Sequence, residues 1–395
     1  MNKKTILIID PIHSTAYLSN KLKENNIRTI ALFSDMSNIA EFNRPSSQLF
    51  DRQIHIKNES IDEIIALISE PVDFVLNGCD QHIHLCEQIA NVLTPSLANN
   101  DKTSIIRGNK FHQQEAMKNH SFPYIKQVLI SRKNPDYDLL KNLTFPVFAK
   151  PLNGGGSIGI FKALTIAEFS EKLAQAPEMV NFDPIDYYLV QEYVTGIEII
   201  IDACSYKGIH TFSHVFTYQK NLINGIPVYR TIETLDDITL VNKAIDFAKK
   251  VLTACEYENG LSHIELFYTD KGEFRLIELN PRISGASGLP NMMAEAVGFK
   301  SQDTLLTEWL TSGQCTSSDF TQRNGFTKAL LIYTNEDIDF SVYDSYQTHL
   351  TISETPLPSD KTPDLTDLRK IVFLFNKSKN SIEHDADSIL NKDLF

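Results

Sequence analysis

The chain has 395 residues, which is long enough for two or three domains. Hydrophobic residues make up 42% and charged residues 22%, a composition that excludes a mainly disordered protein. The formal net charge of −13 disfavours nucleic acids and anionic membranes as main partners. The five cysteines form no C-x-x-C pair, and no apolar run approaches the length of a membrane span. We therefore expect a cytoplasmic protein that binds neither nucleic acid nor membrane.

Strand and helix patterns alternate over residues 1–100. The apolar run Thr5–Ile9 is typical of a buried parallel strand. The predicted order is strand 5–9, helix 14–25, strand 29–33, helix 61–69, strand 72–76 and helix 83–93. This alternation predicts a small doubly wound α/β domain. The first strand leads into D-P-I-H-S-T and not into G-x-G-x-x-G, which argues against a dinucleotide-binding dehydrogenase.

Short strands with glycine turns, mixed with longer helices, follow over residues 101–310. The predicted elements are a helical connector 101–119, strands 127–131, 147–151, 159–162 and 187–193, a strand pair 198–206 and 209–217, a hairpin 263–268 and 274–278, and helices 166–174, 236–255, 289–297 and 303–310. The stretch 216–231 carries no motif, and we expect it to be a loop that covers the substrate. Residues 311–395 are strand-rich and predict a C-terminal α+β domain, with strands at 328–333 and 371–375. The fold class is thus α/β and α+β.

A lysine and a glycine run mark the first candidate site, in F-P-V-F-A-K-P-L-N-G-G-G-S. Lys150 ends a predicted strand and is followed by Gly154, Gly155, Gly156 and Ser157. Successive glycines let the backbone approach a ligand, and their N–H groups can form a nest for an anion. No Gly-Lys-Ser/Thr follows, so the pattern is not a P-loop. The alternative is a flexible hairpin turn with an exposed lysine.

Acidic residues interrupt apolar strands in two further segments. In Y-L-V-Q-E-Y-V-T-G-I-E, Glu192 and Glu198 could instead lie on a solvated strand face. Glu265 and Glu278 lie on two predicted strands joined by the tight turn T-D-K-G, so they could be cross-strand neighbours.

Two further polar residues share the faces of that acidic pair. His263 lies on the same face as Glu265, and Asn280 on the same face as Glu278, because side chains alternate along a strand. Carboxylate and amide oxygens suit Mg²⁺, and the guanidinium of Arg282 offers a fork for a phosphate or a carboxylate. The alternative is a surface hairpin of alternating charge. It is weakened because these strands are largely apolar on both faces, where an unpaired carboxylate is costly.

Together, V-F-A-K-P with its glycine loop, V-Q-E-Y-V-T-G-I-E, and H-I-E with I-E-L-N-P-R resemble the motifs of the ATP-grasp superfamily of carboxylate–amine ligases. The resemblance covers residues 101–310 directly. Residues 1–100 resemble the pre-ATP-grasp domain of biotin carboxylase-type members. The segments S-H-I-E-L and I-E-L-N-P-R-I-S-G are most similar to those of L-amino-acid ligases, which make dipeptides.

The resemblance implies a role for each matched residue. ATP would be bound by Lys110, Lys150, the loop Gly154, Gly155, Gly156 and Ser157, the hinge Glu192, Tyr193 and Val194, and Glu198. Mg²⁺, or Mn²⁺, would be held by Glu265, Glu278 and Asn280, and Arg282 would hold the transferred phosphoryl group. Weaker candidates for substrate binding are His263, Tyr229, Arg230, and the backbone N–H groups of Ser284, Gly285 and Gly288.

The implied activity is ATP-dependent ligation. An amino-acid carboxylate would be activated as an acyl phosphate and joined to an amine, with ADP and phosphate released and no covalent enzyme nucleophile. Two alternatives are an ATP-grasp ligase of another small-metabolite or peptide-modifying pathway, and a nucleotide-binding module without turnover. The resemblance also suggests a homodimer. His82 and His84 more simply have structural roles, and Trp309 is expected in the core.

Overall fold

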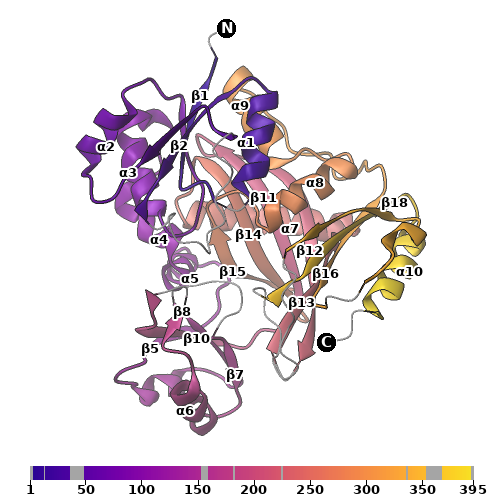
Figure 1. Ribbon diagram of the computed structural model, residues 1–395. Helices are drawn as coiled ribbons and strands as arrows, with labels where there is room; N and C mark the ends of the chain where they lie inside the picture. The colour runs from indigo at the N-terminus through magenta and orange to yellow at the C-terminus, as the bar shows by residue number, and fades with distance from the viewer. Residues whose placement is uncertain are drawn as a thin grey trace.

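The structure is a computed structural model that describes residues 3–12, 14–35, 49–152, 159–180, 183–223, 226–334, 337–352 and 367–392. The N-terminal region is a parallel sheet with strand order β3-β2-β1-β4 (Figure 1). Its strands are β1 (Thr5–Ile9), β2 (Arg28–Phe33), β3 (Arg52–His55) and β4 (Phe74–Asn77). Helix α1 (Thr15–Glu24) packs on one face, and α2 (Ile61–Ile68) and α3 (Ile83–Leu93) pack on the other. The predicted doubly wound arrangement is confirmed.

A helical linker and a small antiparallel sheet come next. The linker contains α4 (Ser104–Gly108) and α5 (Lys110–Asn119). The sheet has the order β5-β10-β6-β7, with β5 (Gln127–Ser131), β6 (Val147–Pro151), β7 (Phe161–Ala163), β10 (Tyr187–Glu192) and the covering helix α6 (Ile166–Gln175). The short strands β8 (Met179–Val180) and β9 (Asp183–Pro184) pair with each other. In Figure 1 this sheet and α6 form the lower lobe of the molecule.

The largest sheet is antiparallel and has the order β15-β14-β11-β12-β13-β16-β18-β17. Its first five members in chain order are β11 (Gly196–Tyr206), β12 (Ile209–Ile223), β13 (Ile226–Thr234), β14 (Gly260–Thr269) and β15 (Phe274–Asn280). The C-terminal strands β16 (Phe326–Ile332), β17 (Tyr346–Thr351) and β18 (Lys370–Asn376) continue the same sheet, and α10 (Lys379–Leu390) packs against them. The domain boundaries at 100/101 and 310/311 stay predictions.

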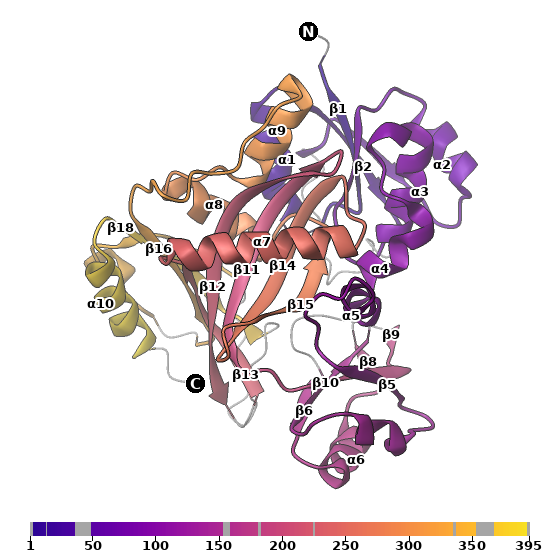
Figure 2. The same ribbon diagram turned by 180° about the vertical axis from the view of Figure 1, so that it is seen from behind.

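The two faces of this sheet are chemically different. Helix α7 (Ile238–Ala254) covers one face, where its apolar stripe packs on Ile199 and Ile201 of β11 (Figure 2). Because side chains alternate along a strand, Glu198, Ile200 and Asp202 point to the opposite face. The face turned away from α7 therefore carries the acidic residues. Helices α8 (Leu289–Ala296) and α9 (Gln302–Ser312) join the large sheet to the N-terminal region.

Most predicted elements are confirmed, with one clear error. The stretch 216–231 is not a loop, because β12 and β13 pair along its length as a long hairpin. Polar residues such as Gln219 and Lys220 hide the strand pattern in the sequence. The residue patterns of β3, β17 and α10 are too weak to predict these three elements from the sequence. Trp309 is buried at 5% exposure, as predicted. None of the helices in the described part of the chain combines the length and the apolarity needed to span a bilayer.

Candidate active site

A cleft of about 1,020 Å³ is lined by residues of both antiparallel sheets. The small sheet contributes Lys150 and the strand end around Glu192, while the large sheet contributes Glu198, Glu265 and Glu278. The size exceeds that of typical small-ligand sites, so the cleft has room for a nucleotide and a second molecule. Most of the residues predicted to bind ATP or a metal therefore meet in one place.

Glu265 and Glu278 are direct cross-strand partners on β14 and β15. The turn between these strands contains Gly272 at φ 76°, a conformation that glycine adopts without strain. His263 and Asn280 are opposed in the same way, and the Asn280 amide donates to Glu278 over 3.1 Å. The predicted neighbour relations along this hairpin are confirmed.

Two lysines compensate the acidic pair. Lys110 begins α5, which Asn109 caps, and its Nζ lies 2.8 Å from Glu278. Burial alone would raise the pKa of Glu278, but Lys110 and Lys150 outweigh it and lower that pKa to about 2. Burial, together with the nearby Lys110 charge, lowers the pKa of Lys150 to about 8. The site thus brings together two carboxylates and two ammonium groups, which is unusual in a purely structural cluster.

The oxygen atoms on this hairpin fit a hard divalent cation. Two carboxylates placed directly opposite each other repel unless positive charge lies between them. The Asn280 amide nitrogen is bonded to Glu278, which leaves its oxygen as a third donor. Carboxylate and amide oxygens are the donor types that Mg²⁺ and Mn²⁺ prefer. Glu265, Glu278 and Asn280 therefore form a chemically suitable donor set.

His263 connects the hairpin to a buried acid. Its Nδ1 lies 2.6 Å from Asp202 and its Nε2 lies 3.3 Å from Glu265. Burial would lower the pKa of His263, but Asp202 and Glu265 raise it to about 10. The sequence predicted His263 only as a weak substrate contact. In the structure, each of its two ring nitrogens faces a carboxylate.

Glu198 forms an ion pair that the sequence did not reveal. Its carboxylate accepts hydrogen bonds of 2.8 and 2.6 Å from Lys220, and the Tyr229 hydroxyl lies 3.5 Å away. The Lys220 ammonium also lies 3.9 Å from the centre of the Tyr229 ring. Glu198 is 6% exposed, so it does not lie on a solvated face. Tyr229 lines the cleft as predicted, whereas Arg230 is buried and is not among the lining residues.

Arg282 is held by the N-terminal region. Its Nε donates to Asp80 over 2.7 Å, and its Nη1 donates to the Ile283 carbonyl over 2.9 Å. Asp80 lies just after β4, at the carboxyl end of the parallel sheet. The guanidinium has five N–H groups, and these two bonds use the one on Nε and one of the two on Nη1. Asp80 was missed because 202 positions separate it from Arg282.

Two of the residues predicted to contact adenine, Glu192 and Tyr193, already form hydrogen bonds within the protein. The Tyr193 N–H donates to the Pro146 carbonyl over 2.9 Å, so Tyr193 can offer a base only its carbonyl. The Glu192 carboxylate accepts from the Thr144 N–H over 2.9 Å, which closes the end of the small sheet. Val194 lines the cleft. The predicted adenine contact is thereby reduced to the Tyr193 carbonyl and the backbone of Val194.

Two of the three backbone groups predicted to bind a substrate carboxylate are already engaged. The Ser284 N–H donates to Gln302 over 3.0 Å, and the Gly288 N–H donates to the Ser14 hydroxyl over 3.2 Å. A Cβ at Gly288 would lie 2.5 Å from the Tyr17 ring, so packing explains this glycine. In the free protein these two N–H groups are thus hydrogen-bonded within the fold, and the predicted binding of a substrate carboxylate by this segment stays a prediction. The loop residues Gly154, Gly155, Gly156 and Ser157 lie outside the described residues.

Comparison with known proteins identifies the central region. Residues 143–290 match the family described as ATP-grasp domain. This part of the chain is an ATP-grasp domain. The match includes Lys150, Glu198 and the whole hairpin that carries Glu265 and Glu278, so the predicted resemblance is confirmed.

Curated relatives of this chain include two named ligases. Dapdiamide A synthase of Enterobacter agglomerans is 24% identical over 257 residues, which are 62% of this chain and 58% of that protein. D-alanine–D-alanine ligase of Francisella philomiragia is 25% identical over 228 residues, which are 54% and 70% of the two chains. The chain thus spans less than two thirds of the length of the first relative.

Solved structures confirm the fold over the whole chain. L-amino acid ligase from Bacillus licheniformis superposes with a TM-score of 0.73 at 14% identity, and the match covers 100% of this chain and 98% of that one. N5-carboxyaminoimidazole synthetase from Staphylococcus aureus, in complex with ADP, gives 0.71 at 14% identity and covers 98% and 96%. The chain therefore shares its fold with these two proteins over nearly its whole length.

Proposed function

We propose that the protein is an ATP-dependent carboxylate–amine ligase that joins an amino-acid carboxylate to the amine of a second amino acid. The observation that carries the proposal is the pair Glu265 and Glu278, opposed on one hairpin beside Lys110 inside a cleft of about 1,020 Å³. Such a pair suits a bound cation and a polyphosphate together.

The lysines would bind the nucleotide phosphates. Lys150 and Lys110 both line the cleft, and Lys110 is ion-paired with Glu278. A triphosphate would offer these ammonium groups additional oxygen partners, which offsets the cost of burying them. Apolar side chains that line the same cleft, such as Ile125, Phe148 and Phe267, would cover the flat base.

The hairpin residues would order the phosphoryl transfer. Glu265, Glu278 and Asn280 would hold Mg²⁺ or Mn²⁺, which when bound neutralises negative charge on the phosphate oxygens. A substrate carboxylate oxygen forms a bond to the γ-phosphorus as the bond to the bridging oxygen of ADP breaks. Arg282, held by Asp80, would keep the transferred phosphoryl group in line for this step.

The amine would then displace phosphate from the acyl phosphate. Its nitrogen forms a bond to the carbonyl carbon, the carbon–oxygen bond to phosphate breaks, and the proton that the nitrogen loses passes to the departing phosphate. The Arg282 guanidinium would stabilise the negative charge that develops on the carbonyl oxygen. Exclusion of water from the cleft would protect the acyl phosphate from hydrolysis. Residues of this chain would thus bind and orient the reactants without forming a covalent enzyme intermediate.

The named relatives favour amino acids as substrates. Dapdiamide A synthase and D-alanine–D-alanine ligase are similar in sequence, and L-amino acid ligase is similar in structure. The S. aureus N5-carboxyaminoimidazole synthetase gives nearly the same TM-score, so a ligase for another small metabolite is the second candidate. A nucleotide-binding module without turnover is the third, and the complete acidic set on the hairpin argues against it.

The test is phosphate release screened over all pairs of amino acids with ATP and Mg²⁺. We expect release only with particular pairs, and a product whose mass is the sum of both substrates minus water. Tight ATP binding without phosphate release for any pair would favour the silent module. Phosphate release only with a carboxylate or an amine that is not an amino acid would favour the second candidate.

A further inference from the structure

A row of polar side chains crosses the large sheet one step behind the carboxylate pair. The row is opposed in register on the neighbouring strands β12, β11, β14 and β15, and its members are His214, Asp202, His263 and Asn280. It lies on the face turned away from α7. All four residues are at least nine-tenths buried.

Asp202 occupies the centre of this row with no direct contact to the cleft. One of its oxygens lies 2.6 Å from His263 Nδ1 and the other lies 2.9 Å from His214 Nε2. Asp202 is 0% exposed, in a strand that is otherwise aliphatic around it. Replacing a buried ion pair by well-packed apolar residues of similar volume is often neutral or stabilising, so a buried carboxylate is weak evidence for a role in stability. Stability alone therefore does not explain why this strand carries an aspartate.

Two contacts lead from the row to the proposed metal ligands. His263 Nε2 lies 3.3 Å from Glu265, and the Asn280 amide lies 3.1 Å from Glu278. Each carboxylate of the pair is therefore oriented by a residue of the row behind it. His214 instead leads away from the pair, because its Nδ1 meets the Ser213 hydroxyl, which donates to the Lys300 carbonyl.

We propose that Asp202 is a positioning residue of the active site, which fixes the His263 ring so that Nε2 holds Glu265 in the orientation needed to bind a divalent cation. This inference rests on the proposed function, because it assigns Asp202 a role behind the same hairpin. Groups that orient metal ligands commonly change metal affinity 10- to 100-fold when they are removed. Asp202 thus acts on the cation only through His263 and Glu265.

The test measures Mn²⁺ binding by electron paramagnetic resonance in the presence of a non-hydrolysable ATP analogue, so no turnover is needed. Asp202→Asn should raise the Kd for Mn²⁺ about 10-fold, because the neutral amide holds the His263 ring less firmly than the charged carboxylate does. The matched control is His214→Gln, which removes the other contact of Asp202 and should leave the Kd within about twofold. Equal effects of both variants, or no effect of Asp202→Asn, would overturn the inference.

A double-mutant cycle separates positioning from a general loss of packing. If Asp202 acts through His263, Asp202→Asn should add nothing to the effect of His263→Asn on the Mn²⁺ Kd. Additive effects would contradict the inference. Should Asp202→Asn fail to fold, as judged by circular dichroism, His263→Asn alone decides, because an unchanged Kd would refute the role of the ring.

The two proposals fail in different ways. If the wild type binds Mn²⁺ with the analogue, shows the expected variant effects and releases no phosphate with any substrate pair, the proposed ligase activity is wrong and the positioning role stands. If the wild type does not bind Mn²⁺ in the cleft, the positioning role is wrong.

Discussion

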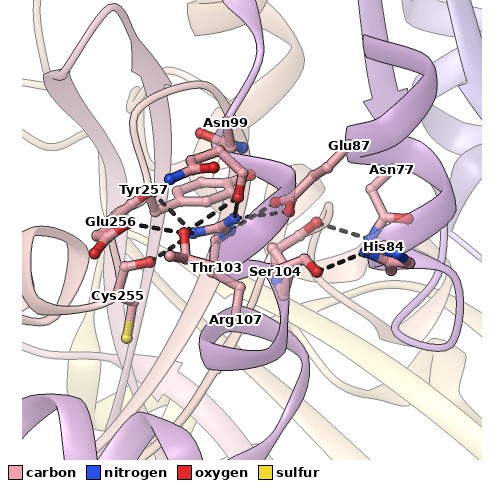
Figure 3. A network of polar contacts seen from close by, with 12 residues as sticks. Asn77, His84, Glu87, Asn99, Thr103, Ser104, Arg107, Cys255, Glu256 and Tyr257 are labelled. Carbon is pink, nitrogen blue, oxygen red and sulfur yellow. Dashed lines mark hydrogen bonds and ion pairs between the residues drawn. The ribbon is translucent and has the colours of Figure 1, made fainter. Parts of the chain in front are cut away.

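Two buried charge clusters in this chain differ in how their charges are arranged. In the first, Arg107 joins three regions of the chain (Figure 3). Its guanidinium makes a two-pronged contact with Glu87 of α3 at 2.6 and 2.7 Å, and it also donates to the carbonyls of Asn100 and Cys255. Arg107 is 0% exposed, and one positive charge meets one negative charge. This is the pattern of a structural clamp.

The second cluster, in the cleft, places like charges together. Glu265 faces Glu278, and Lys110 lies close enough to Lys150 to lower its pKa. Such an arrangement costs stability in the free protein and is relieved when a cation and a polyanion bind. The comparison teaches that burial of charge does not by itself mark a functional site. Crowding of like charges beside a cleft is the better indicator.

Breaking the clamp tests the structural side of this comparison. Arg107→Met leaves Glu87 buried without its partner, so we expect the free energy of unfolding to fall by about 3–5 kcal/mol. Urea denaturation followed by circular dichroism measures the change. The double variant Arg107→Met with Glu87→Gln should lose less, because it removes both charges. An unchanged unfolding midpoint in Arg107→Met would show that the clamp is not structural.

Breaking the acidic pair tests the functional side. Glu278→Gln removes a proposed cation ligand, so kcat should fall roughly 10²–10³-fold while the far-UV spectrum stays unchanged. The matched control is Glu273→Gln on the same hairpin, which removes an exposed acid that is paired with Arg275. Its activity should stay near that of the wild type. Near-full activity of Glu278→Gln would refute the metal assignment.

Replacing the planar guanidinium of Arg282 by an ammonium keeps the positive charge and sharpens the comparison. Arg282→Lys keeps one positive charge but loses the planar fork, so kcat should fall about 10- to 100-fold while the KM for ATP changes less than about threefold. Steady-state kinetics with saturating amino acids measure both. Arg275→Lys, whose guanidinium donates to Glu273 and to the Phe274 carbonyl, is the control. Equal losses in kcat and in ATP affinity would contradict the proposed role of Arg282.

The crowded lysines predict a pH effect of smaller size. The pKa of Lys150 is lowered to about 8 by burial and by Lys110, so the free site loses this positive charge as the pH rises through 8. A polyanion prefers the charged lysine, and its affinity should therefore weaken about tenfold between pH 7 and pH 9. Calorimetric titration with the ATP analogue measures this. In Lys150→Arg the side chain stays charged, so the affinity should change less with pH. The same pH dependence in both proteins would show that titration of Lys150 is not its cause.

The sequence allowed prediction of those parts of the site that depend on local pattern. Strand alternation and the T-D-K-G turn were sufficient to make Glu265 and Glu278 neighbours, and to place His263 and Asn280 beside them. The parallel N-terminal sheet also followed from alternating apolar strands and helices. These features depend on spacing within a few residues, which the sequence states directly.

Contacts between distant segments could not be predicted in this way. The Asp80–Arg282 pair and the Lys220–Glu198 pair depend on how whole elements pack, and Lys220 lies in a strand whose polar residues resemble a loop. The hydrogen bonds of the Ser284 and Gly288 N–H groups could not be predicted for a similar reason, because their partners Gln302 and Ser14 lie on distant segments. The contacts of Asp202 could not be predicted either, because the register of the sheet alone places His214 and His263 beside it.

The central claim is that the opposed carboxylates of the β14–β15 hairpin hold a cation beside the phosphates of a nucleotide. A crystal structure with ADP and Mn²⁺, phased to show the anomalous signal of manganese, tests it most directly. The account predicts an anomalous peak bonded to Glu265 and Glu278, with the ADP phosphates next to Lys110 and Lys150. ADP bound in the cleft with no manganese at the pair, or with manganese held elsewhere, would contradict it.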